Sequence, residues 1–132
     1  MGLNNASLLQ GATVAASGGT ALAFSSLGGS PGNTLYAIDD PDIRTRRDIV
    51  CNTTAARPKS DAPNGYTQQR TNATVKIPLT LDNGNVTVNT IRIEMSTDVE
   101  TTDAEKLELR SIAAQVLVDS DFLEFWDNQS LV

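Results

Sequence analysis

Residues 72–95, NATVKIPLTLDNGNVTVNTIRIEM, carry the clearest structural pattern in the chain. In the first half of this segment, the apolar residues Ala73, Val75, Ile77 and Leu79 occupy alternate positions. Successive side chains of a β-strand point to opposite faces of the sheet, so a period of two indicates a half-buried strand. The segment therefore predicts a long strand with one apolar face.

The Asn83-Gly84 pair divides this segment into two β-prone halves. Both residue types tolerate positive φ, which a two-residue hairpin turn requires at its central positions. The pair therefore predicts a β-hairpin whose second strand covers residues 86–95.

The register of that second strand stays open between two alternatives. With a two-residue turn, Val86 and Val88 would share the apolar face of the first strand, but Ile91 and Ile93 would fall on the opposite face. Either a bulge interrupts the strand at residues 89–90, or the connection is a looser loop than the Asn-Gly pair implies.

The sequence before this hairpin predicts four short strands. Residues 7–16, 20–26 and 34–38 are rich in Thr, Ser and Ala, and turn signals that contain glycine separate them. Residues 46–54 form the fourth strand-like segment.

The sequence after the hairpin predicts two helices. Thr102 and Glu105 match a capping box, in which the hydroxyl accepts an orphan N–H and the glutamate reaches back. An apolar stripe at helical spacing then runs through Leu109, Ile112, Ala113, Val116 and Leu117. A second short helix over residues 122–127, capped by Asp119 or Ser120, presents Phe122, Leu123, Phe125 and Trp126. These large apolar side chains need a partner surface to cover them.

The order of elements predicts an α+β fold, with an antiparallel meander sheet of five to six strands followed by two C-terminal helices. We expect a single domain over residues 1–132. Residues 1–98 would form an N-terminal hairpin and the sheet, and residues 99–132 would form a helical dimerisation segment. With 39% apolar residues and few aromatic ones, such a chain has a thin core if it stands alone.

Charge changes together with this pattern. Residues 43–93 hold eight of the ten Lys and Arg residues and have a net charge of +5, whereas residues 94–132 have a net charge of −8. Residues 1–42 contribute a further −3. This asymmetry indicates one face suited to a polyanion and another suited to water.

Composition argues against several other classes of protein. The chain has no histidine and a single cysteine, Cys51, so it has neither an intrachain disulfide nor a cluster of soft zinc ligands. Asp39, Asp40 and Asp42 lack the closing glutamate of a calcium loop. No nucleophile motif is present, and no apolar run is long enough for a signal peptide or a membrane span. We expect no enzymatic activity, no metal, no cofactor and no membrane contact.

The pattern of elements resembles the coat proteins of the single-stranded RNA bacteriophages. Residues 101–117, TTDAEKLELRSIAAQVL, carry the likeness best, and DIVCNT at 48–53 and TVKIP at 74–78 resemble the central strands of that family. The order and length agree across nearly the whole chain.

The resemblance implies an interlocked homodimer, in which the C-terminal helices of one subunit cross onto the sheet of the other. It further implies that dimers assemble into an icosahedral shell, with the helices outside and one sheet face inside against the genome. The implied location is the virion, and the bacterial host cytoplasm during assembly. The implied dimer-interface residues are Leu109, Ile112, Val116, Phe122, Phe125 and Trp126. The implied capsid-contact loop consists of Leu81, Asp82, Asn83, Gly84 and Asn85.

The family also binds single-stranded viral RNA on the inner sheet face, including an operator hairpin through which coat protein represses translation. The resemblance and the charge pattern together give the candidate RNA-binding residues Arg46, Val50, Asn52, Arg70, Asn72, Thr74 and Lys76. Two departures argue for general genome contact over tight operator binding. Asp48 lies where a cation would help, and the last long strand offers no Tyr or Trp on the candidate face to stack an unpaired base.

Two alternatives from other classes stay open. A small β-rich adhesin or pilin-like module would bind protein by strand exchange at a sheet edge. A free RNA-binding repressor that never assembles would leave the loop around residues 80–88 without a purpose.

Overall fold

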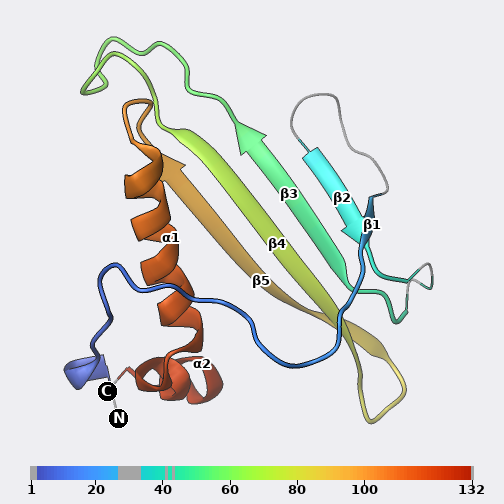
Figure 1. Cartoon of the computed structure of the whole chain (residues 1–132). Coiled ribbons are helices and arrows are strands. Elements are labelled where there is room, and N and C mark those ends of the chain that lie inside the picture. Colours follow the sequence, from blue (N-terminus) through green and yellow to red (C-terminus); the bar gives the residue numbers. More distant parts are fainter. Residues whose placement is uncertain (1–2, 27–33, 41, 43, 132) are drawn as a thin grey trace. The chain divides into compact units, whose positions relative to one another are not determined.

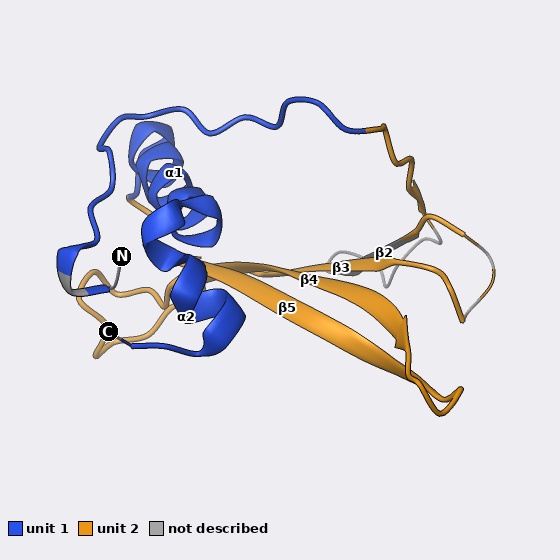
Figure 2. Ribbon diagram, turned by 90° about the horizontal axis from the view of Figure 1, so that it is seen from below, with its two compact units in different colours: residues 1–19, 101–132 blue, residues 20–100 orange. Residues whose placement is uncertain are grey.

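The computed structural model describes residues 3–26, 34–40, 42 and 44–131, and it divides the chain into two compact units. Residues 20–100 form the sheet unit, and residues 1–19 together with 101–132 form the helical unit (Figure 2). The elements, in chain order, are η1 Leu3–Asn5, β1 Ser25–Ser26, β2 Thr34–Ile38, β3 Asp48–Thr54, β4 Gln69–Thr80, β5 Val86–Thr97, α1 Asp103–Val118, η2 Ser120–Phe122 and α2 Leu123–Asn128 (Figure 1). That the whole chain forms one domain stays a prediction.

The sheet is an antiparallel meander in the order β1-β2-β3-β4-β5. β1 has only two residues, so the other four strands make up most of the sheet. The strand predicted at residues 34–38 is confirmed, and the strand predicted from residue 46 begins at Asp48. The antiparallel sheet followed by C-terminal helices therefore agrees with the α+β prediction.

One of the predicted N-terminal strands is wrong, and another is much shorter than predicted. Residues 7–16 contain no strand, and residues 20–26 contribute only β1. The small residues of these segments have weak β-propensity. Backbone groups between Ser7 and Ala12 bond instead to side chains of the helical unit, so they do not need a neighbouring strand.

The hairpin between β4 and β5 resolves the open register. The N–H of Leu81 donates to the Asn85 carbonyl at 2.7 Å, and the N–H of Gly84 donates to the Leu81 carbonyl at 2.9 Å. Gly84 has φ 87°, a left-handed conformation that glycine adopts without strain. The connection is therefore a three-residue loop with glycine at its last position, which confirms the looser-loop alternative.

No bulge interrupts β5, because its pairing with β4 continues without a break from Val86 to Thr97. Val75 lies opposite Ile91 and Ala73 lies opposite Ile93. These isoleucines therefore share the face of β4 that alternation marks as apolar. Val86 lies on the other face, so the two-residue-turn placement is wrong.

The sheet has two chemically different faces, defined by the pairing of opposite residues. We call the polar face the one that carries Asp48, Val50, Asn52, Thr54, Arg70, Asn72, Thr74, Lys76, Thr90, Arg92, Glu94 and Ser96. The apolar face carries Ile49, Cys51, Ala73, Val75, Ile77, Leu79, Ile91, Ile93 and Met95. Several of its side chains are exposed, with Ile93 at 42% and Leu79 at 46%.

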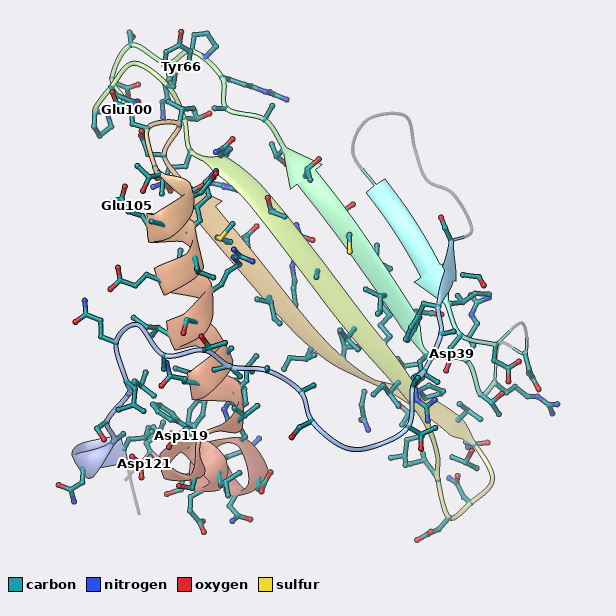
Figure 3. The ribbon with its side chains drawn as sticks, viewed as in Figure 1. Asp39, Tyr66, Glu100, Glu105, Asp119 and Asp121 are labelled. Carbon is teal, nitrogen blue, oxygen red and sulfur yellow. The ribbon has the colours of Figure 1, made fainter. Side chains whose placement is uncertain are left out.

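The helical unit begins α1 with the predicted capping box. The Thr102 hydroxyl accepts the Glu105 N–H at 3.2 Å, and the Glu105 carboxylate accepts the Thr102 N–H at 3.1 Å. Glu105 lies at the first turn of α1 (Figure 3). Asp119 follows α1 and accepts the Asp121 N–H at 2.9 Å, so it caps the short turn η2 that leads into α2. The capping box and both predicted helices are confirmed.

An N-terminal arm, residues 7–12, lies along the helices of the same unit. Gln115 uses both ends of its side-chain amide, accepting the Leu9 N–H and donating to the Leu9 carbonyl, each at 2.9 Å. The Asp121 carboxylate accepts the Ser7 N–H at 3.1 Å, and the Ser111 hydroxyl donates to the Ala12 carbonyl at 2.5 Å. The helices thus bind the main chain of the arm.

The chain by itself has almost no buried core. Among the apolar residues whose side chains are described, only Ile38 is buried, and no large side chain is fully enclosed. A domain of this size normally buries many apolar side chains completely. The sequence-based expectation of a thin core is confirmed. In the described part of the chain, no helix combines the length and the apolar character needed to span a bilayer.

Candidate nucleic-acid interface and subunit contacts

Six of the seven candidate RNA-binding residues come together on the polar face. The β3–β4 register sets Val50 opposite Thr74 and Asn52 opposite Asn72, and the Asn52 side-chain amide lies 3.3 Å from the Asn72 amide oxygen. Arg70 and Lys76 lie at the two ends of the same row of β4. The arrangement offers amides, a hydroxyl and two cations on a surface of two adjacent strands.

The seventh candidate, Arg46, lies just before β3 and pairs with Asp48. The guanidinium Nε is 3.1 Å from the Asp48 carboxylate, and the side chains are 21% and 14% exposed. Asp48 also lies opposite Lys76 across the β3–β4 ladder. The carboxylate that the sequence marked as unfavourable for RNA is therefore matched by a neighbouring cation.

The other two arginines before β3 are also compensated locally. The Arg47 guanidinium donates to the Asp39 carboxylate at 3.0 Å, and the main-chain N–H of Arg47 donates to the same carboxylate at 2.6 Å. The main-chain bond holds the pKa of the Asp39 carboxyl below its ordinary value; Asp39 is labelled in Figure 3. Arg44 pairs with Asp42 at 3.5 Å, and the N–H of Arg44 lowers the pKa of Asp42. This basic cluster is a set of ion pairs rather than an uncompensated cationic patch.

Arg70 and Lys76 differ from these arginines. No ion pair of either side chain occurs with any residue that the structure describes. The sheet unit as a whole has eight Lys and Arg residues against nine Asp and Glu residues, so its net charge is close to zero. Together with Arg57 and Arg92, Arg70 and Lys76 are thus the cations of the sheet unit that form no ion pair with a described residue.

The structure adds Arg92 and Glu94 to the polar face, which the sequence did not single out. Arg92 lies opposite Thr74 and Glu94 lies opposite Asn72, and both side chains are exposed. The number of residues in the hairpin loop decides which face of the sheet each β5 side chain lies on. In the structure, Gly84 takes the left-handed position of a three-residue loop, whereas the Asn-Gly pair alone is compatible with a two-residue turn as well.

The capsid-contact loop predicted at Leu81, Asp82, Asn83, Gly84 and Asn85 forms the tip of the β4–β5 hairpin. The hairpin continues beyond the last β3–β4 pair, so residues 77–80 and 86–89 pair only with each other. Apolar side chains occur on both faces of this two-stranded ribbon: Ile77 and Leu79 on one, and Val86 and Val88 on the other. All four are at least 44% exposed.

The predicted dimer-interface residues lie on the helices of the helical unit. Leu109 and Trp126 are exposed at 47% and 43%, and Ile112, Val116, Phe122 and Phe125 are half-buried. The Trp126 indole N–H donates to the Val116 carbonyl at 2.8 Å, and the rings of Trp126 and Phe125 meet edge to face at 5.0 Å.

No group of three or more metal-ligating side chains gathers in the described residues.

The antiparallel sheet and the C-terminal helices that follow it match the fold of a phage coat protein. The chain superposes with a TM-score of 0.83 on the subunit described as the virus-like particle of bacteriophage GQ-907, at 30% sequence identity, covering 98% of this chain and 99% of that one. It also matches the virus-like particle of bacteriophage ESE058 with a TM-score of 0.62 and 13% identity, covering 83% and 86% of the two chains. No protein-family model and no curated protein sequence matches it.

The chain belongs to the coat proteins of the single-stranded RNA bacteriophages. It is a structural protein of the virion, as the resemblance in residues 101–117 implied.

Proposed function

We propose that this protein forms dimers that assemble into an icosahedral shell and package single-stranded genomic RNA against the polar face of the sheet. The near-full-length similarity to a subunit of a bacteriophage virus-like particle supports the assembly step. The single observation that carries the RNA assignment is the row of Arg70, Asn72, Thr74 and Lys76 on one face of β4, with Asn52 and Val50 beside it.

The chemistry of this row suits an RNA backbone better than a particular base sequence. Lysine and arginine displace counterions from phosphates, and amides and hydroxyls bond to phosphate or sugar oxygens. The polar face of β5 carries no aromatic side chain that could stack an unpaired base. We therefore assign general genome packaging to this face, with repression through an operator hairpin as a weaker secondary activity.

Burial supports the interlocked dimer. The chain alone buries one described apolar residue, and the predicted interface side chains Leu109 and Trp126 remain about half exposed. Crossing of the helices onto a second subunit would supply the missing contact area. The exposed apolar ribbon of residues 77–80 and 86–89 would supply contacts between dimers around the symmetry axes of the shell.

Expression of the chain alone in bacteria tests the assembly proposal. The lysate is treated with nuclease, separated by gel filtration and imaged by negative-stain electron microscopy, and the ratio of absorbance at 260 and 280 nm is recorded for any large species. We expect uniform particles that contain protected RNA. A small soluble species without nucleic acid would contradict the proposal and favour the adhesin-like alternative.

Lys76→Glu tests the RNA surface, but it places a second carboxylate opposite Asp48 in the β3–β4 pair. Lys76→Gln removes the positive charge without adding a carboxylate there. Both should lower the RNA content of particles while dimers persist. Loss of one phosphate contact should also reduce the salt dependence of RNA binding by about one unit of slope. Lys106→Gln on α1 is the matched control, and equal RNA content in all variants would exclude Lys76 from the interface.

A further inference from the structure

Tyr66 places an exposed aromatic ring in the connection between β3 and β4 (Figure 3). Among the described side chains of the sheet unit, it is the one exposed aromatic ring, and 46% of the residue is accessible to solvent. Tyrosine combines a large flat apolar body with a polar tip, which suits it to contact with a partner. The place of this ring relative to the polar face therefore matters.

The pairing of β3 with β4 continues into this connection in the same register. Thr54 and Arg70 form the last pair of the ladder, and Pro58 and Tyr66 form a further antiparallel pair four positions beyond it on each side. Residues an even number of positions apart along such a pairing lie on the same face. Exposure also alternates from residue 66 to residue 70, with Tyr66, Gln68 and Arg70 exposed and the two residues between them half-buried. Tyr66 and Gln68 therefore extend the polar row of β4 beyond Arg70.

Hydrogen bonds fix the main chain around Tyr66. The N–H of Tyr66 donates to the Asn64 side-chain oxygen at 3.2 Å, and the Asn64 side-chain amide donates to the Asp98 carboxylate at 2.7 Å. The N–H of Thr67 donates to the Arg57 carbonyl at 2.8 Å across the connection. A binding group that is already positioned loses less conformational entropy when its partner arrives.

The extended row combines the groups that a single strand of nucleic acid requires. It carries two cations, two amides and a hydroxyl, and it ends in an aromatic ring; its members are Lys76, Thr74, Asn72, Arg70, Gln68 and Tyr66. Ten positions of extended chain span about 33 Å. Proteins that bind single strands without sequence preference pair a positively charged track with rings on which bases stack. Bases inside a double helix are already stacked and paired, so this ring suits an unpaired base.

We propose that Tyr66 stacks an unpaired base of the packaged RNA, at the end of a track that begins at Lys76 and continues past Arg70 into the β3–β4 connection. The inference rests on the proposed packaging function, because it adds a base contact to the phosphate contacts of that surface. A ring stacks every kind of base, so the contact agrees with general packaging. It also supplies the aromatic group that the polar face of β5 lacks.

Binding of two RNAs separates stacking from a structural role of the ring. One probe is an oligouridylate of about ten nucleotides, which covers the row at roughly 3.4 Å per nucleotide. The other is an abasic strand of the same length, which keeps the riboses and phosphates. Both are titrated against the full-length protein below the concentration at which it assembles. The native chain, Tyr66→Leu and Tyr66→Phe are compared.

We expect Tyr66→Leu to bind the oligouridylate about tenfold more weakly and the abasic strand as the native chain does, because only a base can stack. Tyr66→Phe keeps the ring and should bind both RNAs within about twofold of the native chain. Equal losses on both RNAs, or no loss on either, would overturn the stacking assignment. A native chain that binds neither RNA would instead contradict the packaging function itself.

The salt dependence of binding distinguishes the ring from the cations. Tyr66→Leu removes no charge and should leave the slope of log affinity against log salt unchanged, whereas Arg70→Gln should reduce it by about 0.7. Arg57→Gln is the matched control, because Arg57 is exposed, has no ion pair with a described residue and lies one position out of step with the Pro58–Tyr66 pair. An equal reduction for Arg57→Gln and Arg70→Gln would overturn the placement of the track on the polar face.

Cross-linking gives a measurement that needs no substitution. Native particles made in bacteria are irradiated with ultraviolet light, digested with protease and nuclease, and analysed by mass spectrometry. We expect a nucleotide adduct on the peptide that contains Tyr66. Adducts confined to other peptides would overturn the proposal, and particles without RNA would contradict the packaging function.

Discussion

The bonds that stabilise the sheet unit internally differ in kind from those that stabilise the helical unit internally. In the sheet unit, a regular main-chain ladder runs through β2 to β5, and side chains only decide which face is polar. In the helical unit, single side chains such as Gln115 and Asp121 are buried and bond to the main chain of a distant segment. We therefore expect the sheet to tolerate side-chain changes that the helical unit does not.

The largest expected effect is at Trp126, which the proposed dimer would place in the interface between subunits. Replacement by alanine removes the bond to the Val116 carbonyl and the ring contact with Phe125. Large-to-small changes of this kind in a packed interface cost about 3–5 kcal/mol. We expect Trp126→Ala to weaken the dimer by that order, measured by analytical ultracentrifugation.

Leu131→Ala is the matched control, since this side chain is 72% exposed near the C-terminus. It should leave dissociation unchanged. If Trp126→Ala destabilises the helices in thermal unfolding while the dimer dissociates as before, the tryptophan acts within one chain and the interlocked arrangement loses its support.

The next effect is expected at Gln115, whose amide bonds to both polar groups of Leu9. Gln115→Leu keeps the approximate volume but leaves the N–H and C=O of Leu9 without these partners. An unmatched buried polar group costs about 1–3 kcal/mol. We expect a loss of that size in urea unfolding, together with faster proteolysis of the arm at residues 7–12.

Leu9→Ala separates recognition of the main chain from recognition of the side chain. The Leu9 side chain is 71% exposed, so its truncation should change stability by less than about 0.5 kcal/mol. A larger loss for Leu9→Ala than for Gln115→Leu would mean that the arm is held through its side chain, and the contrast between the two units would disappear.

The same contrast explains which parts of the structure could be predicted from the sequence. The alternation from Ala73 to Leu79 predicted β4, and Thr102 with Glu105 predicted the start of α1, because each pattern is local. The arm was predicted as a strand because nothing near residues 7–16 reveals that Gln115, more than a hundred positions away, bonds to Leu9.

The polar face shows a similar limit. Asn52, Asn72, Thr74 and Lys76 could be assigned to one face because β3 and β4 have unambiguous alternation. Arg92 and Glu94 could not, since their face depends on whether the loop before β5 has two or three residues. Gly84 decides that count through a left-handed conformation, which an Asn-Gly pair permits in both kinds of turn.

The smallest expected effect concerns the capping box of α1. Thr102→Ala removes the acceptor for the Glu105 N–H and should cost about 1 kcal/mol in thermal unfolding. Ser111→Ala is unsuitable as a control because Ser111 binds the arm, whereas Ser120→Ala leaves the capping bond of Asp119 intact. Equal loss in both variants would indicate a general effect of hydroxyl removal rather than capping.

The glutamate of the same box gives this prediction a pH dependence. The Thr102 N–H, and then its hydroxyl, hold the pKa of Glu105 below its ordinary value in the folded chain. The unfolded chain therefore takes up the proton first, so the contribution of Glu105 is fully present above its unfolded pKa and is lost as the pH falls through the folded one. Asp39 and Asp42 have lowered pKa values for similar reasons, so stability should fall in acid even without Glu105.

The difference in unfolding free energy between the native chain and Glu105→Gln isolates the capping box, because both aspartates are present in both proteins. That difference should shrink as the pH drops below about 4, and a constant difference between pH 7 and pH 3 would mean that the carboxylate charge does not stabilise the helix start.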